Sequence, residues 1–315
     1  MIGEDWPAMA AINSVQLHGK LWLTENDTRT SKTTLLKDRS NGIAPPGQYE
    51  SGVWLGPEDM ETSVSLLWKN TARMLTHGYG GWWFDMWGGW FSDPKLLYVL
   101  EKTQQLYTIF SPSTGEDMKS QVGVFVDEEL SFWDPTYGKL TENILSNRYP
   151  LAKTGSSYDL FLRSDLPSMP ITQYKVVWLM GFLELSTKEE VSIKKMTKQG
   201  LTVLWTNGRG THIFHPNEGQ LFMDGKFNWS AKELGVLWDK AEVHRYLDTE
   251  DVFYIGRNWM GIHTIKGGSR TICLPFKAEV IDPLGNEILY DSTRFFELHL
   301  EPKSTKILRI NPLRK

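Results

Sequence analysis

The chain has 315 residues, 40% apolar and 23% charged, which is the composition of an ordinary globular protein long enough for two or three domains. Its formal net charge of −4, without a stripe of Lys and Arg interleaved with aromatic residues, argues against nucleic acid as a partner. A single cysteine, Cys273, excludes an internal disulfide, and no run of about 18 apolar residues is present to span a membrane.

The first part of the chain predicts a helix, a short strand and a long loop. Residues 6–17 have helical spacing with Pro7 in the first turn, and Gly19 ends this segment. "KLWLT" (20–24) predicts a buried strand. The loop over 26–56 is rich in Thr, Ser, Gly and Pro, and loops of that length are usually functional or disordered.

The next three elements continue this alternation. Residues 57–78 predict a helix, because acidic residues fill its first turn and Gly78 closes it. "GWWFDMW" (81–87) is an apolar run interrupted only by Asp85, as in a strand of a parallel barrel, and residues 94–110 return to helical spacing. The order predicts repeated β/α units.

Tryptophan is unusually frequent, with 14 in the chain, and six aromatic residues fall within residues 82–91. A wide hydrophobic core explains part of this enrichment, and stacking of sugar rings on flat aromatic faces explains it as well. Composition leaves both interpretations open.

After a polar break over 111–120, a second α/β unit is expected. Its predicted strands and helices alternate, as in a small doubly wound domain, and lie at 121–129, 136–147, 174–181, 186–200 and 201–208. Ser186 and Glu189 form a capping box for the second of these helices.

From residue 242 the pattern changes to short strands and turns, which predicts a compact antiparallel β-sandwich. The expected domains are therefore 1–115, 116–241 and 242–315.

Four segments follow one another in chain order: "KLWLTE", "GWWFDMW", "VGVFVDEE" and "YKVVWLMGFLELSTKEEVSIKKMTKQGLTVLWTNG". Together they resemble the C-terminal part of a retaining glycosidase of the β-galactosidase type, similar to family 42 glycoside hydrolases. The resemblance covers essentially the whole chain. It implies the last strands of a (β/α)8 barrel, then a flavodoxin-like trimerisation domain, then a small β domain. It also implies a carbohydrate substrate, β-linked galactosides or related sugars, and a homo-oligomer, a trimer.

By this resemblance Glu25, which closes the seventh barrel strand, matches the family's nucleophile. Active sites of such barrels lie at the C-terminal ends of the strands, and retaining hydrolysis needs a second carboxylate about 5 to 5.5 Å away. Trp22, Asn26 and Asp27 are expected to contact sugar, and Arg29 to keep Glu25 or Asp27 ionised.

On the eighth strand, Trp87 matches an aromatic residue that forms the floor of the sugar-binding site. Asp85 is expected to contact a sugar hydroxyl or pair with a basic residue. Trp90, on the following loop, is expected to contact ligand. Trp82 and Trp83 are adjacent and point in opposite directions, so at least one is expected to pack against a helix.

The chain departs from the family in lacking a recognisable acid/base, which follows an Asn on the fourth barrel strand. Asn217-Glu218 and Asn286-Glu287 are its only Asn-Glu pairs, and both lie outside any barrel segment. About 110 residues precede the second domain, whereas a barrel takes about 250. The first six strands and the acid/base are therefore expected outside this chain, Met1 looks internal to a longer protein, and the chain alone is expected to be inactive.

A rival interpretation belongs to another functional class. Residues 121–315 would then act as a non-catalytic oligomerisation or carbohydrate-contact module. "LSFWDP" after "VGVFVDEE" is no phosphate cradle, so neither flavin nor dinucleotide, and no other cofactor, is expected. His212 and His215 have a spacing that suits a metal, but loop or packing histidines are the default. The sequence leaves the sugar and the cellular compartment open, and the absence of disulfides permits a cytoplasmic location.

Overall fold

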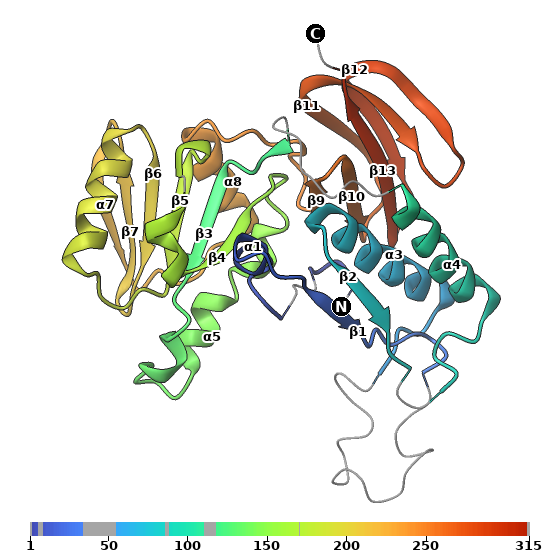
Figure 1. The fold of residues 1–315 in the computed structure, drawn as a ribbon, viewed down its shortest axis with the longest axis horizontal. Coiled ribbons are helices and arrows are strands. Elements are labelled where there is room, and N and C mark those ends of the chain that lie inside the picture. The colour runs from blue at the N-terminus through green and yellow to red at the C-terminus, as the bar shows by residue number, and fades with distance from the viewer. Residues whose placement is uncertain are drawn as a thin grey trace, which may run out of the picture. The chain divides into compact units, whose positions relative to one another are not determined.

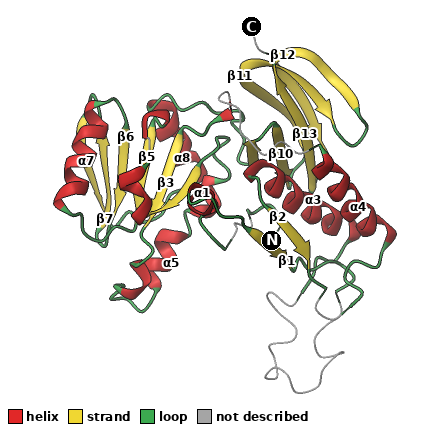
Figure 2. Ribbon diagram, viewed as in Figure 1, coloured by secondary structure: helices red, strands yellow, loops and turns green. Residues whose placement is uncertain are grey.

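The computed structural model describes residues 2–5, 9–33, 55–85, 88–109, 118–169 and 171–313. The chain packs into two compact units (Figures 1 and 2). Unit 1 comprises Met1–Glu4, Trp22–Gly115 and Tyr254–Lys315, and unit 2 comprises Asp5–Leu21 and Glu116–Phe253. The segments expected as the first and third domains thus share unit 1, and the three-domain boundaries stay a prediction. In the described ranges, no helix has the length and apolar character needed to cross a bilayer.

Unit 2 is built on a six-stranded sheet with the order β4-β3-β5-β6-β7-β8. The first four of these strands run parallel, and β7 and β8 form an antiparallel hairpin at one edge. The strands are β3 (Val122–Val126), β4 (Asp159–Leu162), β5 (Val176–Met180), β6 (Thr202–Thr206), β7 (Gly210–His215) and β8 (Gly219–Asp224). Because the second strand along the chain lies outside the first, the order changes direction at β3 and β5, as in doubly wound sheets.

Both faces of this sheet are covered, which explains why its central strands are apolar at every position. Val124 and Trp178 pack on one face and Phe125 and Leu179 on the other. The helices of unit 2 are α1 (Ile12–Leu17), α5 (Lys139–Leu145), α6 (Arg148–Leu151), α7 (Thr187–Lys198) and α8 (Ala231–Lys240), with short 3-10 turns η3 (Leu130–Phe132), η4 (Arg163–Ser168) and η5 (Ile171–Gln173).

The predicted helices of unit 2 differ in how well local signals define their ends. The capping box of α7 is confirmed, with Ser186 N–H donating to Glu189 Oε2 at 2.7 Å and Glu189 N–H donating to Ser186 Oγ at 3.3 Å. In contrast, α1 begins only at Ile12, because Ala11 at its N-cap has no side-chain acceptor, so the helix expected over 6–17 is shorter in its described part.

Unit 1 is organised around α3 (Met60–His77), which is buried on nearly all sides. It contacts α4 (Pro94–Thr108), and Thr71 Oγ1 meets Thr103 Oγ1 of that helix at 2.7 Å. Both ends of α3 follow the sequence signals: Asp59 Oδ1 accepts from Thr62 N–H, and Gly78 adopts a left-handed φ of 70°.

The five C-terminal strands form one antiparallel sheet with the order β12-β11-β13-β10-β9. They are β9 (Val252–Gly256), β10 (Trp259–Thr264), β11 (Gly268–Asp282), β12 (Glu287–Leu300) and β13 (Ser304–Pro312), and β11 and β12 make a long curved hairpin (Figure 1). The antiparallel character agrees with expectation, but the two stacked sheets of a sandwich are not confirmed. The five strands form a single layer, because β11 lies between β12 and β13 and pairs with both, and α3 packs on β10 and β13.

The two strands expected from the barrel, β1 (Leu23–Asn26) and β2 (Gly80–Trp83), form a two-stranded parallel sheet. A closed barrel is not formed by the described residues. Strand β2 ends at Trp83, earlier than the strand predicted over 81–87, and Met86 and Trp87 lie outside the described residues.

Candidate active site

The carboxyl ends of β1 and β2 are held in register, with Glu25 opposite Trp82. Alternation along β1 sends successive side chains to opposite faces. Asn26 is buried on one face, where its Nδ2 lies 3.6 Å from Met74 Sδ of α3. Glu25 and Leu23 are exposed on the opposite face, and Trp82 is 47% exposed. Two residues expected at one sugar site, Glu25 and Asn26, are therefore on different sides of the strand.

The Glu25 carboxylate makes no hydrogen bond or ion pair with any residue that the structure describes. Arg29, expected to hold Glu25 or Asp27, pairs with Asp27: its guanidinium donates to Asp27 Oδ2 at 2.6 Å and to the Asp27 carbonyl at 2.7 Å. The loop after β1 thus folds back on itself. Glu25 is left as an exposed carboxylate at the end of a parallel strand.

Four of the predicted residues are brought together beside this strand end, in what we name the Trp90 cluster: Asp27, Arg29, Asp85 and Trp90. The Arg29 guanidinium lies 5.1 Å from the centre of the Trp90 ring. Trp90 N–H donates to Asp85 Oδ2 at 3.0 Å, and the Thr30 hydroxyl donates to the Trp90 carbonyl. Sequence reasoning missed Thr30, because no local pattern links a hydroxyl to a carbonyl sixty residues away.

The burial of Trp90 does not fit the expectation that its ring contacts a ligand. Its side chain is fully buried and lies under Arg29, so in this arrangement it packs the loop instead of offering a free face to a ligand. Within the described part of the chain, however, Trp90 Nε1, Asp85 Oδ1 and Trp22 Nε1 are buried without a hydrogen-bond partner. Buried polar atoms are nearly always paired, so such atoms are expected where water or a ligand completes a site. All three belong to residues that the sequence placed at the site.

The two Asn-Glu pairs lie in or beside turns. Glu218 precedes β8 and binds Lys240 Nζ, and this hydrogen bond lowers the pKa of Glu218, which is the opposite of what a general acid needs. Asn286 has a φ of 51° in the turn between β11 and β12. Neither position resembles the end of a buried parallel strand.

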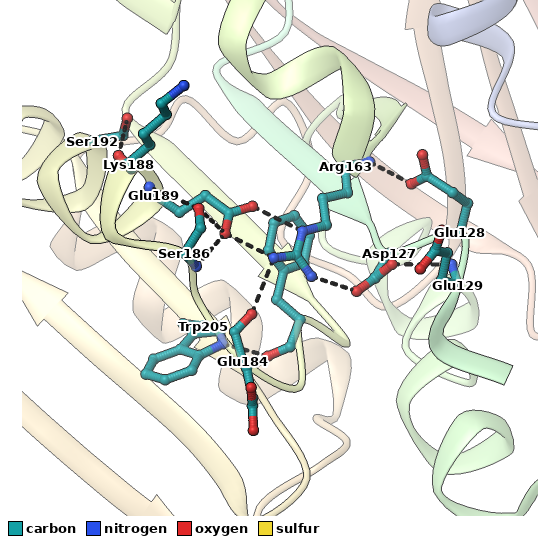
Figure 3. Close-up of polar contacts among 11 residues, drawn as sticks. Asp127, Glu128, Glu129, Arg163, Glu184, Ser186, Lys188, Glu189, Ser192 and Trp205 are labelled. Carbon is teal, nitrogen blue, oxygen red and sulfur yellow. Dashed lines mark hydrogen bonds and ion pairs between the residues drawn. The ribbon is translucent and has the colours of Figure 1, made fainter. Parts of the chain in front are cut away.

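Unit 2 has its own polar cluster at the carboxyl edge of its sheet, centred on Arg163 (Figure 3). The Arg163 guanidinium binds both carboxylate oxygens of Glu189 at 2.8 and 2.7 Å, Asp127 Oδ2 at 2.7 Å and the Glu184 carbonyl at 3.1 Å. It also lies 4.6 Å from the centre of the Phe182 ring. Because these residues follow β3, β4 and β5, one side chain ties together three loops.

Hydrogen bonds decide the charge states in this Arg163 cluster. Burial by itself lowers the pKa of Arg163, but its hydrogen bonds to Glu189 and Asp127 outweigh burial and raise the pKa above its usual range. Burial raises the pKa of Glu189, and hydrogen bonds from Arg163 and Ser186 more than offset it, so this pKa lies below its usual range. The carboxyl edge of the sheet, where doubly wound sheets bind ligands, therefore carries an internal ion pair. Sequence reasoning noted Glu189 only as a cap and missed Arg163.

The two histidines of β7 take different environments. The His212 ring stacks between Trp205 and Phe222, with centroids 4.6 and 4.3 Å away, and burial lowers its pKa. His215 Nδ1 accepts a hydrogen bond from Asn217 N–H in the turn that follows. No group of three or more His, Cys, Asp or Glu side chains suited to a metal occurs among the residues described.

Comparison with known proteins gives a fold resemblance and no close relative. No model of a protein family matches the sequence, and no curated protein matches it. Among solved structures, a β-galactosidase from Bacillus circulans sp. alkalophilus is similar at a TM-score of 0.57 and 11% identity, over 98% of this chain and 59% of that one.

Two further solved structures have a similar fold. A catalytic mutant of a family 42 β-galactosidase from G. stearothermophilus is similar at a TM-score of 0.50 and 10% identity, over 79% of this chain and 51% of that one. An α-L-fucosidase from Paenibacillus thiaminolyticus is similar at a TM-score of 0.51 and 10% identity, over 96% and 62%. The chain thus spans about half to three fifths of the length of the structures it resembles. Its mixed α/β fold is like that of part of the family 42 glycoside hydrolases.

Proposed function

We propose that this chain is part of a retaining glycoside hydrolase that acts on β-linked galactosides or related sugars, with Glu25 as the nucleophile. The observation that carries the proposal is the position of Glu25: an exposed carboxylate at the carboxyl end of a parallel strand, in a fold similar over almost the whole chain to part of a β-galactosidase. Catalytic groups of β/α barrels lie at that end of the strands.

In the proposed reaction the Glu25 carboxylate attacks the anomeric carbon and forms a covalent glycosyl-enzyme. A second carboxylic acid protonates the departing oxygen and then activates the water that releases the sugar. That second group is not assigned to this chain, because Glu218 and Glu287 lie in or beside turns outside β1 and β2. We therefore expect the 315-residue chain by itself to be inactive.

The remaining predicted residues would support the sugar rather than react with it. Trp22 and Asp85 each have a buried polar atom without a partner in the described residues, which is where a hydroxyl or a bridging water would complete the site. The Asp27–Arg29 pair holds the loop after β1, and Trp87 is proposed as the floor of the site, although it lies outside the described residues. Asn26 would act through its packing on α3.

The domain layout belongs to the same proposal. Residues 1–115 would be the end of a barrel, 116–241 a flavodoxin-like trimerisation domain and 242–315 a small β domain. The strand order of unit 2 supports the second of these assignments, because β4-β3-β5-β6 matches the 2-1-3-4 order of flavodoxin-like sheets. The chain would then work as a homotrimer.

The test is to express the reading frame with any coding sequence that precedes Met1, and to measure hydrolysis of 4-nitrophenyl β-D-galactopyranoside. Glu25→Gln should lower kcat by about 10⁴-fold, the order seen when one member of a catalytic set is removed. Azide should restore turnover to Glu25→Gly and yield a galactosyl azide of inverted configuration. Glu61→Gln, on an exposed carboxylate of α3 beside Lys95, is the matched control and should keep full activity.

An active enzyme whose kcat is unchanged by Glu25→Gln would refute the assignment of Glu25 as the nucleophile. The second candidate function, a non-catalytic oligomerisation or carbohydrate-contact module over 121–315, is favoured by a specific observation: Arg163, Asp127 and Glu189 pair with one another at the carboxyl edge of the sheet, where doubly wound sheets bind cofactors. A protein that assembles but hydrolyses no glycoside would support it.

A further inference from the structure

The segment that follows β3 exposes three aromatic rings within six residues. Phe132 is 81% exposed, Trp133 66% and Tyr137 fully exposed. The segment is anchored at its start by Leu130, which is buried over Gly181; a Cβ on that glycine would lie 2.6 Å from Leu130 Cδ2. We name residues 130–138 the aromatic loop.

Hydrogen bonds fix the backbone of the aromatic loop. The Asp134 carboxylate accepts four of them, from the backbone N–H and the hydroxyl of Thr136 and of Thr141, at 2.6 to 2.8 Å. The Thr136 hydroxyl also accepts from Leu140 N–H at 2.8 Å, which joins the loop to α5. The exposed rings are therefore carried on an ordered frame.

Trp133 is oriented as well as exposed, because its indole Nε1–H donates to Glu129 Oε2 at 3.3 Å. This hydrogen bond to Glu129 favours one orientation of the ring and so lowers the side-chain entropy that binding a ligand would cost. Tyr137 has a φ of 55°, a conformation that costs a non-glycine residue roughly 1 to 2 kcal/mol, and its side chain gains nothing from burial. Folding therefore does not account for tyrosine at this position.

The charge around the rings narrows the chemistry of the ligand. Residues 127–138 contain four carboxylates, against which stand Arg163, which pairs with Asp127, and Lys139, which follows the segment. Carboxylates remain in excess, so an anionic ligand or an anionic membrane surface would be repelled. Exposed carboxylates such as Glu128 and Glu129 accept hydrogen bonds from hydroxyl groups. The rings lie open to solvent instead of enclosing a space, which suits an extended ligand better than a small caged cation.

We propose that the aromatic loop binds a neutral oligosaccharide, with the C–H face of a pyranose on the Trp133 ring and sugar hydroxyls donating to nearby carboxylates. This site lies in unit 2 and is separate from the proposed catalytic site at Glu25 in unit 1, so the proposal does not depend on the role of Glu25. Loss of the Trp133 ring should weaken binding about tenfold, from the apolar contact that one aromatic face supplies.

The test is native gel electrophoresis of the 315-residue chain in gels with and without a soluble neutral polysaccharide: β-1,4-galactan, xylan or mixed-linkage β-glucan. At least one should retard the wild type relative to a non-binding marker protein, and Trp133→Ala should lose most of that retardation while Trp133→Phe keeps part of it. Phe295→Ala, which removes a 63% exposed ring on β12 of unit 1, is the matched control and should migrate like the wild type.

Three results would overturn the proposal. The first is no retardation of the wild type in any of the three gels. The second is retardation of Trp133→Ala equal to that of the wild type. The third is retardation only in an additional gel that contains the anionic polysaccharide polygalacturonate. Sedimentation velocity measures a further outcome that would contradict the proposal. If the wild type self-associates, Trp133→Ala does not, and no polysaccharide is bound, then the exposed rings bind a second copy of the chain and not a sugar. Circular dichroism and thermal unfolding establish that each variant is folded. None of these results depends on hydrolysis, so they leave the catalytic proposal to its own test.

Discussion

Replacing Arg163 by methionine should destabilise unit 2, because the change removes the partner of two carboxylates and leaves both in place. The Arg163 side chain is 28% exposed, and those of Asp127 and Glu189 are 9% and 15% exposed. Breaking a buried ion pair by removing one partner costs about 3 to 5 kcal/mol. Since the Arg163 cluster is partly open to water, we expect the lower end, about 3 kcal/mol.

Thermal or urea unfolding followed by circular dichroism measures this loss. For a unit of roughly 150 residues, about 3 kcal/mol corresponds to a decrease of about 6 to 12 °C in Tm. Arg163→Lys should fall between the wild type and Arg163→Met, because an ammonium group cannot bind both Glu189 oxygens and Asp127 at once. Arg148→Met is the control: this exposed guanidinium lies 4.9 Å from the Tyr149 ring centre, and its loss should cost less than about 0.5 kcal/mol.

The pH dependence of this difference has a definite sign. The folded-state pKa of Glu189 is depressed, so its contribution is fully present above the unfolded pKa, near 4.5, and is lost as the pH falls through the folded value. The difference between wild type and Arg163→Met should therefore be largest near neutral pH and shrink below about pH 4. A loss under about 1 kcal/mol at pH 7 would show that the Arg163 cluster contributes little to stability. A loss that does not change down to pH 3 would show that ionised Glu189 is not the source of the contribution.

Two smaller predictions test local structure in each unit. Gly78→Ala should destabilise unit 1 by roughly 1 to 2 kcal/mol, because Gly78 has a φ of 70° and its new Cβ would lie 1.9 Å from Arg257 Nε; an unchanged Tm would contradict this. Ser230→Ala should cost about 1 kcal/mol in urea unfolding, because Ser230 and Glu233 form the capping box of α8. Hydrogen bonds from Lys226 and then Ser230 lower the pKa of Glu233 to about 2, so the cost of Ser230→Ala should be retained at pH 5; its disappearance there would argue against the capping box.

The geometry of the candidate site was predicted only in part. The sequence, together with the family resemblance, placed Asp27, Arg29, Asp85 and Trp90 near two strand ends, and the structure brings these four together. The burial of Trp90 was not predicted. Side-chain burial depends on which loops meet, and the contact between Arg29 and Trp90 joins residues 61 positions apart.

The fold shows the same division. Residues 57–78, 94–110 and 186–200 were recognisable as helices because a helix is specified by neighbours. All three have an apolar period, the first begins with acidic residues, the third begins with a capping box, and a glycine ends both of these. In contrast, β4 and the β7–β8 hairpin were not assigned, since short half-exposed strands carry weak periodic signals, and α8 was missed although Ser230 and Glu233 give it a capping box.

Elements with local causes could be predicted from the sequence alone, and so could apolar strands such as β3 and β5, whose two faces both had to be covered. The exposure of Glu25, the packing of Asn26 on Met74, the pairing of Arg29 with Asp27 and the joining of the C-terminal strands in one sheet could not. The physical reason is that the side of a strand which becomes interior, and the partner that a charge selects, depend on pairing between distant segments. No local pattern of residues encodes that pairing directly.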